Sequence, residues 1–164
     1  APYMVANVGL KETDLPYLYL FGGLATAFTS RYIGMLADRH GKRQIFTLIG
    51  LISIAPLLIT TNLPPVPVWI AICASVIFMV FVSGRFVPAM ALVISSVEPR
   101  LRGGFMSINS AVQQLGLGAA SFLAGSLIGH AADGTLTRYW LVGFIAVGST
   151  LLAIALAWRV KPVA

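Results

Sequence analysis

The sequence predicts an all-α membrane protein, and three observations support that prediction. Hydrophobic residues make up 58% of the 164-residue chain and charged residues only 10%, which is too few polar groups to cover a soluble domain. The apolar residues form long runs, as they do in helices that cross a bilayer. No run shows the short alternating pattern of a membrane β-barrel. We therefore expect a bundle of helices that lies mostly in lipid.

Five apolar runs are each long enough to cross a hydrocarbon core of about 30 Å as a helix. The expected spans cover residues 15–36, 44–62, 67–96, 104–129 and 137–159. Prolines, glycines and charged residues separate them, and proline ends helices because it lacks an N–H donor and restricts its predecessor. Residues 1–9 are expected to be the last turns of a further helix whose start precedes this chain.

Lysines and arginines gather on one side of the expected bundle. Five spans place successive loops on alternate sides, so one side receives Arg39, Lys42, Arg43, Arg100, Arg102, Arg159 and Lys161. By the positive-inside rule this side, with the C-terminus, is cytoplasmic. The formal net charge of +6 then reflects topology and anionic lipid headgroups, and no nucleic-acid partner is expected.

The densest group of charges lies in the stretch IGMLADRHGKR, residues 33–43, between the first two spans. Gly41 suits a tight turn, and Gly34 would let another backbone approach closely. Asp38 adds nothing to the topology bias, but an aspartate can meet the partial positive charge of a helix N-terminus. A pure topology signal is the simpler interpretation, and it leaves the glycines and the aspartate unexplained.

The same stretch, Gly34-Met-Leu-Ala-Asp38-Arg39-His-Gly41-Lys42-Arg43, resembles the loop signature of the major facilitator superfamily at every position. Residues 83–88 and 99–107, followed by the glycine- and alanine-rich fourth span, resemble arabinose-efflux-like and drug-efflux-like permeases of that family. The resemblance implies that the five helices form most of one six-helix half of the fold. We expect the chain to be the C-terminal half of the fold, with residues 1–9 as the end of helix 7. Its partner would be the missing N-terminal half of the same transporter.

The resemblance also implies a function. The chain would be a fragment of a secondary active transporter in a bacterial inner membrane, moving a small molecule by alternating access, with efflux and proton coupling expected. A cytoplasmic gate would be formed by Gly34, Asp38, Arg39, Gly41, Lys42 and Arg43, with Glu98 as the local acidic partner of the basic residues. The alternative that stays open is a self-contained membrane scaffold or assembly protein without transport activity.

Three polar residues inside the spans are candidates for lining a cavity. Arg85 lies roughly 18 Å along a helix from the Glu98 end of its span, too far for comfortable snorkelling, so a packed or cavity-facing partner is expected. Asn109 and Gln113 are four residues apart and share one helix face. They could join helices or contact a substrate, and both interpretations stay open.

Motifs of enzymes are absent from the sequence. No His, Cys and Asp cluster has the spacing of metal ligands, no serine stands in a nucleophile turn, and no glycine loop follows a strand to bind phosphate. We therefore expect neither an enzyme nor a metal or cofactor. No Asp or Glu lies mid-span, so proton coupling would need an acid in the missing half.

Overall fold

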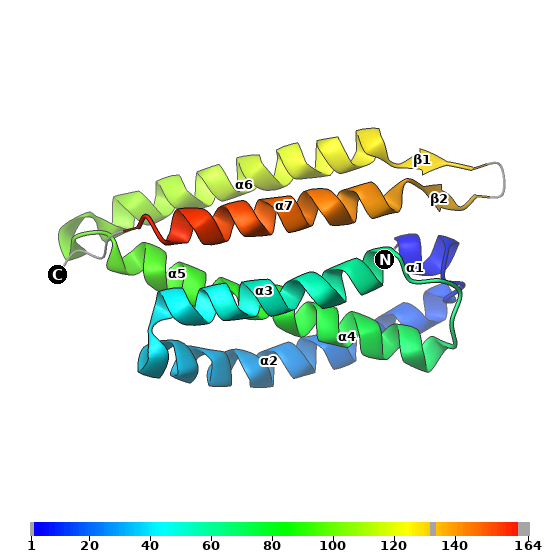
Figure 1. Ribbon diagram of the computed structural model, residues 1–164, viewed down its shortest axis with the longest axis horizontal. Helices are drawn as coiled ribbons and strands as arrows, with labels where there is room; N and C mark the ends of the chain where they lie inside the picture. The colour runs from blue at the N-terminus through cyan, green and yellow to red at the C-terminus, as the bar shows by residue number, and fades with distance from the viewer. Residues whose placement is uncertain (1, 132–133, 161–164) are drawn as a thin grey trace.

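The computed structural model describes residues 2–131 and 134–160, and most of them are helical (Figure 1). The N-terminal part consists of α1 (Pro2–Ala6), the short 3-10 helix η1 (Glu12–Asp14), α2 (Leu15–His40) and α3 (Lys42–Thr61). Next come α4 (Val68–Gly84), α5 (Phe86–Ser95), the 3-10 helix η2 (Pro99–Leu101) and α6 (Arg102–Leu127). The strands β1 (Gly129–His130) and β2 (Leu136–Thr137) then lead into α7 (Tyr139–Ala157).

Long helical rods occupy the positions of the five expected spans: α2, α3, α4 with α5, α6 and α7. Among the described residues, three rods are long and apolar enough to cross a membrane, namely Lys42–Thr61, Val68–Ser95 and Tyr139–Ala157. Helices α2 and α6 have 26 residues each, so their length suffices. They carry more polar side chains, Arg31 and Asp38 in α2 and Asn109 and Gln113 in α6. For these two helices a membrane crossing stays a prediction.

The third expected span, residues 67–96, corresponds to one rod, Val68–Ser95, that consists of two helices. Arg85 separates α4 from α5 with φ −67° and ψ −20°. The break follows from Pro88, which has no N–H to donate to the Gly84 carbonyl four residues earlier and whose ring crowds that carbonyl. The N–H of Ala89 still donates to the Arg85 carbonyl at 3.2 Å, so the two helices continue as one rod.

The connections gather at two opposite ends of the bundle (Figure 1). The α2–α3 junction, the α5–α6 connection and the end of α7 lie at one end, which we call the motif end. The α3–α4 connection and the β1–β2 hairpin lie at the other. The expectation that residues 37–43 and 97–103 share one side agrees with this arrangement.

Glycines mark the closest approaches between helices. A Cβ on Gly22 of α2 would collide with the Met79 side chain of α4, and one on Gly84 would lie 2.5 Å from Cδ1 of Ile33. A Cβ on Gly143 of α7 would collide with Thr61 of α3. These positions let α2 pack on α4 and α3 pack on α7, and the sequence alone did not single them out.

Helix α6 lies at the edge of the bundle, alongside α7 (Figure 1). It contains no buried residue among those described. Leu115 and Phe122 are 75% and 77% exposed. Since α6 exposes many large apolar side chains, this helix depends on lipid or further protein to bury most of its surface.

The end opposite the motif end is tied together by polar contacts of the N-terminal segment. The Tyr3 hydroxyl donates to the Leu63 carbonyl at 3.0 Å, and its ring stacks on Tyr139 with 4.3 Å between centroids. The Asn7 side chain donates to the Leu136 carbonyl and accepts from the Leu136 N–H, both at 2.9 Å. Of residues 1–9, expected to end a helix, only Pro2–Ala6 are described as helical.

The connection between α6 and α7 contains a β-hairpin. In it, Gly129 pairs with Thr137 and His130 with Leu136 in an antiparallel register. Residues 132–133 of this connection lie outside the described residues.

Candidate functional site: the gate loop and a cavity at Arg85

The connection between α2 and α3, where the gate is expected, is shorter than the sequence suggested. Helix α2 extends to His40 and α3 begins at Lys42, so Asp38 and Arg39 are helical and Gly41 alone separates the helices. Gly41 has φ 95° and ψ 129°, a conformation that side chains disfavour. Its N–H donates to the Ala37 carbonyl and its carbonyl accepts from the Ile45 N–H, both at 3.1 Å. One glycine therefore ends one helix and starts the next.

Three charges around Gly41 oppose the dipoles of their own helices, whereas Arg39 in the last turn of α2 does not. Asp38 lies in the last turn of α2, at the partially negative helix end, whereas Lys42 and Arg43 open α3 at its partially positive end. A charge at the unfavourable helix end costs about 0.3–1 kcal/mol. Asp38 is exposed, and within the described ranges it forms no ion pair. The dipole of its own helix therefore destabilises Asp38, and a partner elsewhere would offset this cost.

Arg43 is held by the end of α7 and not by Glu98. Its Nη2 donates to the Val160 carbonyl, and its guanidinium carbon lies 5.3 Å from the centroid of the Trp158 ring, within the range of a cation–π contact. Trp158 Nε1 in turn donates to Thr47 Oγ1 at 3.2 Å. Neither Lys42 nor Arg43 pairs with Glu98 in the part of the chain that is described, because α3 packs on α7 and directs Arg43 toward its end.

Gly34 does not meet the expectation of a close backbone approach. A Cβ added there would have Val87 Cγ1 of α5 as its nearest neighbour, at 3.7 Å. That distance is an ordinary van der Waals contact, so an alanine would fit within these helices. The close approaches lie instead at Gly22, Gly84 and Gly143.

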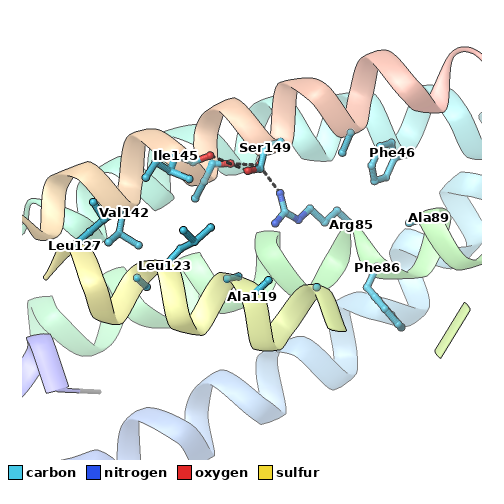
Figure 2. A pocket seen from close by; sticks show the side chains of 16 residues that line it. Phe46, Arg85, Phe86, Ala89, Ala119, Leu123, Leu127, Val142, Ile145 and Ser149 are labelled. Atoms are coloured by element: carbon cyan, nitrogen blue, oxygen red, sulfur yellow. Dashed lines mark hydrogen bonds between the residues drawn. The ribbon is translucent and has the colours of Figure 1, made fainter. Parts of the chain in front are cut away.

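Arg85 points into a cavity of about 640 Å³ between α3, α5, α6 and α7 (Figure 2). Its Nη1 donates to Thr150 Oγ1 at 2.7 Å, and Thr150 Oγ1 donates to the Ala146 carbonyl at 2.8 Å. Thr150 is only 4% exposed. Apart from Arg85, Ser149 and Thr150, the lining is apolar: Phe46, Phe86, Ala89, Gly116, Ala119, Ala120, Leu123, Ala124, Leu127, Val142, Ile145, Ala146 and Ala153.

The other two cavity candidates lie outside this lining. Gln113 Nε2 approaches Met90 Sδ at 3.7 Å. Asn109 Nδ2 is buried, and it has no hydrogen-bond partner within the described residues. A substrate contact for either residue stays a prediction. The residue that Arg85 contacts is Thr150, which the sequence analysis did not select.

Within residues 2–131 and 134–160, no group of three or more His, Cys, Asp or Glu side chains could hold a metal ion. Cys73 is a free thiol in α4. The chemistry of both candidate regions is thus that of charges, dipoles and apolar walls.

The fold and the charged junction together define a multi-helix integral membrane protein whose helices carry no sign of a catalytic centre within the described residues. A sequence profile of the Major Facilitator Superfamily matches residues 1–164. The chain therefore belongs to the Major Facilitator Superfamily, whose members are transporters and not enzymes. No solved structure matches the chain.

Proposed function

We propose that the chain forms one half of a secondary transporter that moves a small molecule by alternating access, with the α2–α3 junction as its gate. The observation that carries this proposal is the placement of Asp38 at the unfavourable end of its own helix, exposed and without an ion pair in the described residues. Such a carboxylate gains most from the N-terminus of a helix in another part of the transporter.

The energies are of the right size for a gate. Meeting a helix N-terminus in a partly buried position stabilises a carboxylate by up to about 2 kcal/mol. An equilibrium shifts tenfold for about 1.4 kcal/mol. Contact between Asp38 and the other half is therefore sufficient to favour one of two conformations without locking the carrier in it.

The finer parts of the proposal rest on sequence resemblance and charge. The resemblance of segments 83–88 and 99–107 supports an efflux-type permease, and we assign the chain to its C-terminal half. Proton coupling would use an acidic group of the N-terminal half. The basic side chains at the motif end support a cytoplasmic C-terminus in a bacterial inner membrane. Family membership favours this proposal over a membrane scaffold.

The test is Asp38→Asn in the full-length protein, with Asp14→Asn as a matched control. Asp14 is the same residue type, at the opposite end of the bundle in η1. We expect Asp38→Asn to lower efflux of a probe such as ethidium and to shift the distribution toward the inward-open state, with expression unchanged. Pulsed electron paramagnetic resonance between labels at Leu101 and on the partner half measures that distribution. Wild-type efflux and an unchanged distribution in Asp38→Asn would reduce the junction to a topology signal.

A further inference from the structure

We propose that the cavity beside Arg85 binds a small amphipathic anion, a carboxylate carried on an apolar body. The inference concerns a site inside one helical bundle, away from the gate, and it does not depend on the transport activity proposed above. It follows from the charge of Arg85, the composition of the cavity wall and the position of α6.

The first step is that Arg85 has a charge without a counter-ion. A guanidinium offers several N–H donors in a planar fork, and Nη1 alone is used, by the neutral oxygen of Thr150. Thr150 directs its own proton to the Ala146 carbonyl, so its oxygen offers Arg85 only a dipole. No acidic side chain pairs with Arg85 within the described residues. Because a charge in a membrane-spanning bundle is costly unless it is paired, the site favours an anion.

The second step is that the fork of Arg85 suits a carboxylate. A carboxylate accepts two parallel N–H bonds from a guanidinium, and such charge-assisted bonds are stronger than neutral ones. Beside Arg85 the wall supplies only the hydroxyls of Ser149 and Thr150. An inorganic phosphate or sulfate would be left with most of its oxygens facing hydrocarbon. A single carboxylate can be satisfied by the N–H groups of Arg85 alone, since the protons of Ser149 and Thr150 are already donated to the Ile145 and Ala146 carbonyls.

The third step is the apolar body of the ligand. The cavity volume of about 640 Å³ lies within the range of small-molecule sites. Away from Arg85 the wall consists of small and aliphatic side chains such as Ala119, Leu123 and Val142 (Figure 2). A hydrocarbon chain would lie along this wall and would be removed from water, which is worth about 0.8 kcal/mol per CH₂ group. The wall therefore selects against hydrophilic anions.

The fourth observation concerns the helix that covers the cavity. Helix α6 supplies one side of the cavity and has no buried residue among those described. A ligand between α6 and the rest of the bundle would add contacts where the protein itself makes few. The site thus has both an unpaired charge to hold the head of the ligand and a loosely packed helix to cover its tail.

Binding of tritiated decanoate to the full-length protein in phosphatidylcholine nanodiscs tests the proposal, with empty nanodiscs subtracted. We expect saturable binding of decanoate, and weaker competition by decanol, which lacks the charge, and by acetate, which lacks the apolar body. Decylammonium should not compete. Competition by decanol as strong as that by decanoate, or no saturable binding at all, would overturn the proposal.

Charge variants locate the head of the ligand. Arg85→Gln should weaken decanoate binding about ten- to one hundredfold, the range expected for loss of a hydrogen bond to a charged group, and Arg85→Lys should weaken it less. Arg31→Gln is the matched control, because Arg31 is exposed on α2 and does not line the cavity. Equal loss in Arg31→Gln and Arg85→Gln would mean that decanoate binds to general positive charge, and the site would be refuted.

Cavity-filling variants locate the tail. Ala120→Leu should weaken decanoate binding because Ala120 lines the cavity, whereas Ala111→Leu, on the same helix and outside the lining, should not. Wild-type affinity in Ala120→Leu would place the tail elsewhere and contradict the proposal. Thermal denaturation of all five variants controls for misfolding, because a variant as stable as wild type reports on the site alone.

A carboxylate with an apolar body can come from the membrane or from water. Mass spectrometry of the purified protein distinguishes these two sources. A fatty acid that co-purifies with wild type and is lost from Arg85→Gln indicates a membrane source. A protein that co-purifies with no fatty acid but binds benzoate in an Arg85-dependent way indicates a water-soluble ligand. Transport failure with intact decanoate binding would count against the proposed function only, whereas transport without decanoate binding would count against this site only.

Discussion

Two glycines of the stretch 33–43 should respond in opposite ways to replacement by alanine. Gly41 has φ 95° and ψ 129°, and holding a residue with a side chain in such a region costs about 1–3 kcal/mol. Gly34 lies within α2, and its added Cβ would contact Val87 Cγ1 at an ordinary 3.7 Å. Alanine is favoured over glycine in a helix interior by about 0.5–1 kcal/mol. The two variants should therefore differ by about 1.5–4 kcal/mol in stability.

The assay is thermal denaturation of the full-length variants in one detergent, followed by the loss of the monodisperse peak on size exclusion. Gly41→Ala should denature below wild type, and Gly34→Ala at or above it. Gly118→Ala is the control for helix propensity, because Gly118 lies inside α6 with no atom within 4 Å of an added Cβ. If Gly34→Ala were as unstable as Gly41→Ala, the reasoning would be refuted, and Gly34 would have to contact a backbone outside these helices.

Two further predictions concern packing and topology. Gly143→Ala should destabilise the protein by about 1–3 kcal/mol through overpacking, since its Cβ would lie 3.1 Å from Thr61 Cβ. Adding Thr61→Ala should restore much of the loss, and a double-mutant cycle without coupling would contradict the contact. For topology, single cysteines at His40 and Leu101 in a Cys73→Ser background should be labelled from one side of the membrane and a cysteine at Thr135 from the other. Labelling of Leu101 and Thr135 from the same side would exclude the proposed topology.

Local sequence signals were enough to predict the helical rods. The apolar runs predicted α6 and α7 to within about two residues of their ends, because length and hydrophobicity set a helix in lipid independently of its neighbours. Gly41 was predicted as a turn for a local reason too, the freedom of glycine at positive φ. The extent of α2 was underestimated because charged residues were taken to end the helix. Asp38 and Arg39 remain helical, since Gly41 comes after them.

Contacts between residues that lie far apart in the chain could not be predicted from the sequence. The partner of Arg85 was expected but could not be named, and it is Thr150, 65 residues later. Glu98 was chosen as the partner of Arg43 by sign of charge, whereas packing of α3 on α7 brings Val160 and Trp158 to that side chain. The need for glycine at positions 22 and 143 depends on Met79 and Thr61, which only the arrangement of the rods places opposite them.

The contact of Arg43 with the end of α7 has a practical consequence for handling the protein. The carbonyl that accepts from Arg43 belongs to Val160, and Trp158 lies against the same guanidinium. Any affinity tag or fluorescent protein fused shortly after Val160 would begin within a few residues of the α2–α3 junction. A bulky or acidic fusion there would compete for Arg43, and a measured change in activity would then belong to the fusion. A long neutral spacer, or a tag placed away from Val160, keeps the junction in its native surroundings.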